Sequence, residues 1–182
     1  MLRPYIHQCF LNIFWESDKK GIGKPLLPTP YSLLPSSTMQ ATTEELSQIL
    51  VFSALELPEL ERLQLHTTIK DYQQGEIVMQ EGDRLPTKLY TLLSGSLRIT
   101  KTAATGKETI LRTLLAGEIF AAPALFGNGI APATVTAESN SRILTVERDA
   151  LLEAIRQTPE IALRMLDVFN QRLQLLHDTV HG

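Results

Sequence analysis

Residues 67–147 form a series of short apolar and β-branched runs separated by glycines, and this rhythm restricts the chain to a few folds. Val, Ile, Leu, Thr and Tyr runs of this length favour strands, and the glycines favour the turns between them. The pattern predicts many short antiparallel strands in a β-barrel or β-roll. Thr105-Gly106 is expected at a hairpin tip. The punctuating residues are Gly75, Gly82, Gly95, Gly106, Gly117, Gly127 and Gly129.

Helical patterns flank the strand region. Thr42 and Glu45 form a capping box that predicts a short helix over 43–50. Pro58 suits the first turn of a second helix, and RDALLEAIRQ (148–157) predicts a third before a long final helix. The sequence therefore predicts an α+β, mainly β, fold. It is an antiparallel β-roll (jelly-roll) flanked by short helices, with a long C-terminal helix.

The final helix carries an apolar seam with heptad spacing, which is typical of helices that pair. The seam residues are Ala162, Leu166, Phe169, Leu173, Leu176 and Val180. A second apolar face lies beside the seam and consists of Ile161, Met165, Val168 and Leu175. One face can pack on the helix's own domain while the other meets a partner, so the pattern favours a homodimer. A single broad face packed on the roll is the alternative.

Composition and charge argue against several functional classes. The net charge is −3 with no cluster of Lys and Arg, so a nucleic-acid surface is not expected on this chain. No apolar run approaches the ~18 residues of a membrane span. The one cysteine, Cys9, excludes a disulfide framework within the chain. We expect a cytoplasmic protein without a membrane segment.

Catalytic and metal-binding patterns are also missing from the strand region. The four histidines are His7, His66, His177 and His181, so none can form a cupin-like metal site on the barrel strands. No Gly-x-Ser-x-Gly nucleophile elbow occurs. We expect no enzyme activity, no metal and no cofactor.

The chain divides into three expected parts. Residues 1–41 are proline-rich and lack periodicity, which predicts a disordered or non-native extension. Residues 42–157 form the roll with its flanking helices, and residues 158–182 form the dimerisation helix. Met1 and Met39 both stay open as the true start.

Two segments carry a family resemblance: YQQGEIVMQEGDRLPTKLYTLLSGSLRI (72–99) and TGKETILRTLLAGEIF (105–120). These segments, the second of which contains the Gly117-Glu118 pair, resemble the cyclic-nucleotide-binding domain of the Crp/Fnr regulator family. The resemblance implies a cyclic-nucleotide-binding-like β-roll, a long helix that forms the dimer, and a small-molecule effector. It places the ligand pocket at Gly117, Glu118, Ile119, Phe120, Ala122, Pro123, Leu125, Pro132, Ala133, Thr134, Leu176 and His177.

The phosphate-binding cassette of this family departs from its pattern here. The resemblance places Ala122 at the family's ribose-binding glutamate, and Pro132 and Ala133 at its phosphate-binding arginine and serine. No Lys or Arg occurs between Arg112 and Arg142, so a shift in alignment does not restore the cation. Each lost charge-assisted hydrogen bond costs ~1.5–3 kcal/mol. We expect a degenerate ligand pocket that does not bind cyclic AMP by the usual cassette.

The resemblance also implies a role in transcription. The helix-turn-helix that follows the dimer helix in the family is absent from this chain, so we expect no DNA binding by the chain alone. The favoured interpretation is the effector-sensing and dimerisation module of a Crp/Fnr-type regulator. The alternatives are a stand-alone ligand- or partner-binding module, or a true cyclic-nucleotide receptor with a divergent pocket.

Overall fold

A computed structural model describes the backbone of residues 39–181 and the side chains of residues 39–174. These residues belong to one compact unit, 36–182. The expected extension lies almost wholly outside the described residues. The start of the described chain is held against β1, because Met39 forms an isolated β-bridge with Ile69 and the Ala41 N–H donates to Thr67 Oγ1 at 3.0 Å.

Helices lie at both ends of the described chain, and most of the elements between them are strands. The helices are α1 (Thr43–Ser47), the 3-10 helix η1 (Leu50–Phe52), α2 (Leu57–Gln64), α3 (Ala122–Phe126), α4 (Arg148–Gln157) and α5 (Glu160–His181). The strands are β1 (Thr67–Tyr72), β2 (Ile77–Met79), β3 (Lys88–Ser94), β4 (Ser96–Thr102), β5 (Glu108–Leu115), β6 (Ile119–Phe120), β7 (Thr134–Ala137) and β8 (Ser141–Glu147). The helix expected over 43–50 is shorter than predicted, because Ile49 is extended and separates α1 from η1.

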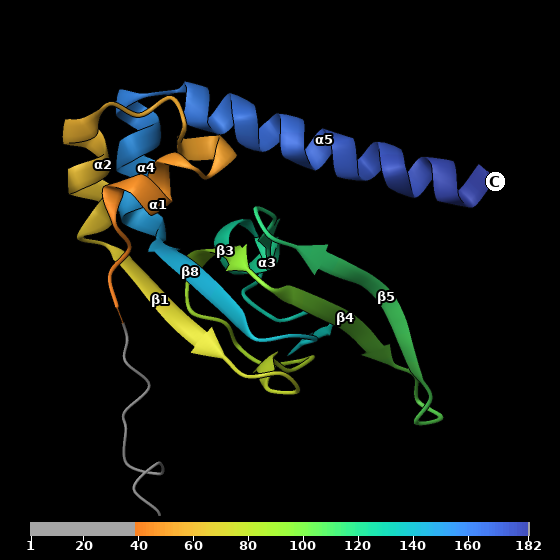
Figure 1. The fold of residues 1–182 in the computed structure, drawn as a ribbon. Helices are drawn as coiled ribbons and strands as arrows, with labels where there is room; N and C mark the ends of the chain where they lie inside the picture. Colours follow the sequence, from red (N-terminus) through yellow and green to blue (C-terminus); the bar gives the residue numbers. More distant parts are fainter. Residues whose placement is uncertain (1–38, 182) are drawn as a thin grey trace, which may run out of the picture. The chain divides into compact units, whose positions relative to one another are not determined.

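Two four-stranded antiparallel sheets form the roll (Figure 1). One sheet has the order β1-β8-β3-β6 and the other has the order β2-β7-β4-β5. The hairpin predicted at Thr105-Gly106 joins β4 to β5, with Gly106 at a positive φ of 81°. The predicted β-roll with flanking helices and a long C-terminal helix is confirmed.

The apolar residues form two cores, and the period-2 alternation of strand β3 shows why. Leu89 faces the first core, which lies under helices α1, α2, α4 and α5, while Tyr90 and Leu92 face the second core inside the roll. Successive side chains of a strand point to opposite faces, so β3 contributes to both cores. The roll interior is thus filled by side chains such as Phe120, whose ring lies 5.7 Å from that of Tyr90.

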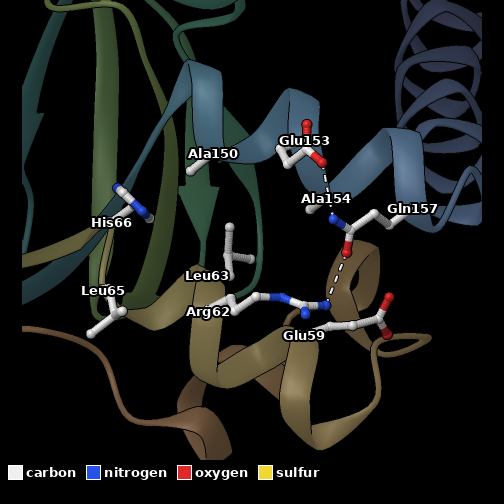
Figure 2. A pocket seen from close by; sticks show the side chains of 9 residues that line it. All are labelled: Glu59, Arg62, Leu63, Leu65, His66, Ala150, Glu153, Ala154 and Gln157. Carbon is white, nitrogen blue, oxygen red and sulfur yellow. Dashed lines mark hydrogen bonds between the residues drawn. The ribbon is translucent and has the colours of Figure 1, made fainter.

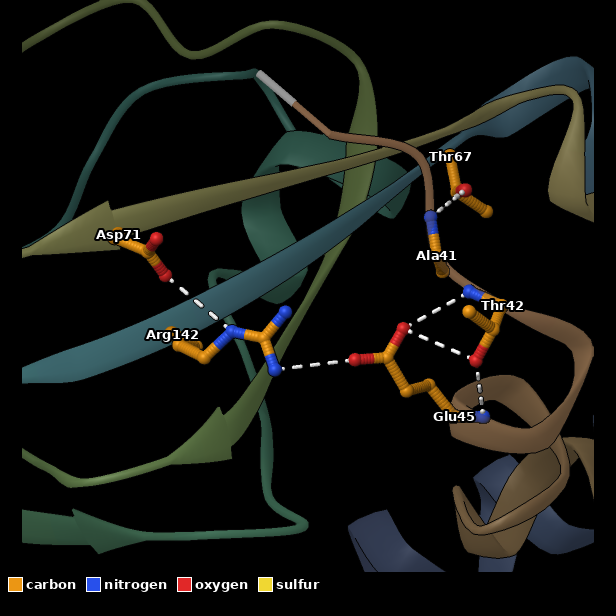
Figure 3. Close-up of polar contacts among 6 residues, drawn as sticks. All are labelled: Ala41, Thr42, Glu45, Thr67, Asp71 and Arg142. Carbon is orange, nitrogen blue, oxygen red and sulfur yellow. Dashed lines mark hydrogen bonds and ion pairs between the residues drawn. The ribbon is translucent and has the colours of Figure 1, made fainter. Parts of the chain in front are cut away.

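The predicted capping box at α1 is confirmed and extends into the sheet (Figure 3). Thr42 Oγ1 accepts the Glu45 N–H at 3.1 Å, and Glu45 Oε2 accepts the Thr42 N–H at 2.9 Å. Arg142 of β8 bridges Glu45 at 3.1 Å and Asp71 of β1 at 3.4 Å. The Thr42 N–H, and then Arg142, hold the pKa of the Glu45 carboxyl below its ordinary value despite its partial burial.

Helix α5 is anchored through one of its two apolar faces. Ile161 and Met165 are 0% and 3% exposed in the core under the helices, and Arg164 donates to the Leu50 carbonyl at 3.0 Å. Leu166 and Leu173 of the same helix lie outside this core and are 63% and 60% exposed. Figure 1 shows the C-terminal half of α5 continuing past α1, α2 and α4. The helix therefore presents an uncovered apolar stripe in this chain.

Within residues 39–181, no helix combines the length and the apolar character that a bilayer crossing requires.

Candidate functional site

The Gly117-Glu118 turn, which begins the cassette, is fastened to strand β3 by backbone hydrogen bonds. The Gly117 N–H donates to the Leu92 carbonyl at 2.7 Å, and the Leu92 N–H donates to the Glu118 carbonyl at 3.0 Å. Gly117 has φ of 91°, a left-handed conformation that strongly favours glycine. Glu118 Oε2 also accepts the Leu115 N–H at 2.7 Å and so closes the turn.

The side chains expected to line the ligand pocket are divided between the two cores. Ile119 and Leu125 belong to the core under the helices, and Phe120 belongs to the core inside the roll. Ala133 is buried and Pro132 is exposed. Of the polar members, Thr134 uses its Oγ1 to accept the Glu81 N–H at 3.1 Å. Among the described members, Ile119 and Phe120 thus belong to different cores, and the assignment of these residues to a ligand pocket stays a prediction.

Helix α3 offers few groups for a phosphate. Its N-terminal flanking residue, Ala121, has a positive φ of 54° and makes no side-chain cap. Ala122 begins the helix without a polar side chain, and Pro123 lacks an N–H in the first turn. Pro132, at the position implied for the family's arginine, also lacks an N–H. None of these residues brings a cationic side chain to the start of α3.

Two arginines from outside the cassette converge on its glutamate. Arg112 of β5 donates to Glu118 Oε1, and Arg172 Nη2 of α5 lies 3.9 Å from the same oxygen. Arg172 Nη2 also donates to the Ile119 carbonyl. No local sequence signal indicates this cluster, because Arg172 is 54 positions after Glu118 and only the fold brings α5 to the turn. We call Arg112, Glu118 and Arg172 the arginine cluster.

The arginine cluster is partly withdrawn from water. The side chain of Arg172 is 22% exposed, that of Glu118 is 29% exposed, and that of Arg112 is 39% exposed. Burial, followed by repulsion from Arg112, lowers the pKa of Arg172, while Glu118 opposes this shift. Two positive groups and one negative group leave the cluster with a net positive charge.

A second contact joins α5 to the cassette. The Phe169 and Phe126 rings meet edge to face with their centroids 6.5 Å apart, and the Arg172 guanidinium lies 6.0 Å from the Phe169 ring. Phe169 of the predicted dimer seam therefore contacts α3 of its own chain, whereas Leu166 and Leu173 are exposed. The seam members Leu176 and Val180, and the pocket candidate His177, have side chains outside the described residues.

A separate cleft of about 230 Å³ lies between α2 and α4 (Figure 2). Its floor includes Leu63, Ala150 and Ala154. Across its opening, Arg62 donates to Gln157 at 2.9 Å, and Gln157 donates to Glu153 at 2.9 Å. These polar groups bond to one another across the cleft, so their geometry alone points to no ligand. Among the described residues, no group of three or more His, Cys, Asp or Glu side chains could hold a metal ion.

The two-sheet roll, its Gly-Glu turn and the long helix define the class of cyclic-nucleotide-binding-like β-rolls. Residues 69–158 match the family model of the cyclic nucleotide-binding domain. This part of the chain is a cyclic nucleotide-binding domain, and its similarity to Crp-type proteins supports the resemblance to the Crp/Fnr family that the sequence motifs carry.

Curated relatives of this chain include a transcriptional regulator and a cyclic AMP receptor protein. The "CRP-like cAMP-activated global transcriptional regulator" of Mycobacterium tuberculosis is 28% identical over 131 residues, which are 72% of this chain and 58% of that protein. The "Cyclic AMP receptor protein" of Thermus thermophilus is 31% identical over 103 residues, which are 57% of this chain and 47% of that protein. The chain thus matches about half the length of these relatives.

Solved structures agree with the fold. The Catabolite Activator Protein of Thermus thermophilus superposes with a TM-score of 0.61 at 26% identity, covering 72% of this chain and 61% of that chain. A cyclic nucleotide-binding domain from Methylobacillus flagellatus gives a TM-score of 0.65 at 17% identity, covering 79% and 86%. At that identity the second likeness supports the fold alone.

Proposed function

We propose that this domain is the effector-sensing and dimerisation module of a Crp/Fnr-type transcriptional regulator, and that its cassette does not bind cyclic AMP in the usual way. Residues 42–157 form the sensory part, and residues 158–182 form the dimerisation helix. The family membership and the named activity of the curated relatives support the regulatory role.

The observation that carries the proposal is the chemistry of the cassette. The positions implied for the ribose- and phosphate-binding side chains hold Ala122, Pro132 and Ala133. A phosphodiester keeps its charge when buried and needs a cation or several donors. Arg112 and Arg172 lie near the cassette turn and contact Glu118, but neither stands at the position implied for the family's arginine. Loss of one charge-assisted hydrogen bond weakens binding by about tenfold to a hundredfold, and three contacts are missing.

A gain-of-function variant tests this assignment. Ala122→Glu, Pro132→Arg and Ala133→Ser together restore the implied cassette side chains. We expect the wild-type chain to show no calorimetric heat with cyclic AMP at millimolar concentration and the triple variant to bind it measurably. The double variant Ala122→Glu with Ala133→Ser, which lacks the cation, is the matched control and should stay silent. Tight binding by the wild-type chain would refute the proposal.

The uncovered stripe on α5 supports the proposed dimer. Leu166 and Leu173 lie seven residues apart and are each more than half exposed, which is the spacing of one heptad. Burial of a leucine side chain at an interface contributes roughly 1.5–3 kcal/mol. Leu166→Glu with Leu173→Glu should therefore yield monomers in light scattering coupled to size exclusion.

Leu65→Glu provides the control, because Leu65 is 65% exposed but lies at the end of α2 rather than on α5. This variant should keep the oligomeric state of the wild-type chain. A double variant of α5 that remains dimeric would exclude this stripe as the interface.

A further inference from the structure

Two guanidinium groups from different elements converge at the cassette turn with only one carboxylate between them. Arg112 comes from β5 and Arg172 from the middle of α5, and Glu118 lies between them. The local charge is therefore one positive unit in excess. Because the three side chains are at most 39% exposed, this excess is less screened than on an open surface.

The two arginines retain hydrogen-bonding capacity. Toward the residues that the structure describes, both form their contacts in the arginine cluster through Nη2. A guanidinium carries five N–H donors. The side chains of Arg112 and Arg172 are 39% and 22% exposed, so water, and hence a dissolved anion, reaches part of each side chain.

Each of the two arginines also has an apolar neighbour. Ile99 of β4 is directly opposite Arg112 in the strand pair and packs against the core inside the roll. The Phe169 ring lies beside Arg172. An oxyanion bound here would have its charged end on the guanidiniums and its other end against apolar side chains.

We propose that Arg112 and Arg172 bind the oxyanion group, phosphate or carboxylate, of a small effector, in place of the cassette arginine that this chain lacks. The inference rests on the proposed function, because it names the effector chemistry of the same sensory domain. Planar guanidinium groups bind such oxyanions with two parallel hydrogen bonds. Since Arg172 belongs to α5, an anion held by both arginines joins the roll to the dimerisation helix.

Glu118 competes with the anion for both arginines. Its carboxylate occupies Arg112 and lies 3.9 Å from Arg172. Replacing it by glutamine removes the competing charge while retaining a side-chain oxygen that can accept the Leu115 N–H. Glu118→Gln should therefore tighten anion binding, by about tenfold if one charge-assisted bond is released.

The test is a titration of the full chain with inorganic phosphate, followed by amide NMR at constant ionic strength, with chloride replaced by phosphate. Saturable shifts are expected at the arginine cluster. Arg112→Gln and Arg172→Gln should each weaken binding at least about tenfold, and Glu118→Gln should strengthen it. Arg156→Gln is the matched control, because Arg156 pairs with Glu153 on the surface of α4; it should change nothing.

Three results would overturn the inference: shifts that do not saturate, shifts that persist unchanged in both arginine variants, or no gain in the Glu118→Gln chain. A folded Arg112→Lys variant, which keeps the charge but loses the guanidinium fork, replaces Arg112→Gln if that chain does not fold. A parallel titration with cyclic AMP separates the two proposals. Silence toward both ligands overturns the anion site alone, whereas micromolar cyclic AMP binding overturns the proposed function.

Discussion

Ile161→Ala tests how helix α5 is held on the domain. Ile161 lies in the first turn of α5 and is 0% exposed in the core under the helices. Truncating a buried isoleucine to alanine costs about 2–5 kcal/mol, because it removes apolar contacts and leaves a cavity. Alanine has a higher helix propensity than isoleucine, which offsets this loss by a few tenths of a kcal/mol. We expect the free energy of unfolding to fall by about 3 kcal/mol.

The assay is urea denaturation at one fixed protein concentration, because a dimer links stability to concentration. Leu163→Ala is the matched control: Leu163 is two residues further along the same helix and 60% exposed, so its loss should stay within about 0.5 kcal/mol. Equal losses for the two variants, or a loss below about 1 kcal/mol for Ile161→Ala, would refute the assignment of this face of α5 to the core.

Three further predictions concern the frame around the site. Thr42→Ala removes the N-cap of α1 and should lower the free energy of unfolding by about 1 kcal/mol in urea denaturation; an unchanged value would contradict the observed cap. Because the folded pKa of Glu45 is lowered, its stabilisation is present above the unfolded pKa of about 4.3 and disappears as pH falls through the lower folded value. In urea denaturation between pH 3 and 6, the free energy of unfolding should fall less steeply with falling pH in Glu45→Gln than in the wild-type chain. An identical pH profile for the two chains would count against the network. Gly95→Ala places a Cβ 2.4 Å from the Asn140 carbonyl oxygen, whereas Gly106→Ala meets nothing within 4 Å. The thermal unfolding midpoint should therefore fall further for Gly95→Ala. Equal decreases for the two variants would show that the strain of a positive φ alone causes the loss.

Much of the fold could be predicted because its signals are local. The capping box at Thr42, the hairpin tip at Gly106 and the helix over 148–157 each depend on neighbouring residues, and all are confirmed. The short helix η1 was missed because Leu50–Phe52 carries no side-chain cap and is held by packing instead. Buried contacts of this kind leave no periodic signal in so few residues.

The candidate site was harder to predict because its geometry depends on distant residues. The absence of a cation within the cassette could be read directly from the sequence. That Arg172 reaches Glu118 could not, since this contact depends on where α5 lies relative to the turn. Phe169 shows the same limit: its heptad position suggested the seam, but its ring meets Phe126 of the same chain.

The central claim is that the cassette of this cyclic nucleotide-binding domain lacks the groups that hold cyclic AMP. Calorimetric titration of the full 182-residue chain with cyclic AMP and cyclic GMP tests it most directly. The account predicts no saturable heat up to millimolar nucleotide. Binding at micromolar concentration would contradict the account. If that binding were retained when Arg112 and Arg172 are both replaced by glutamine, the cassette backbone would suffice without a cation.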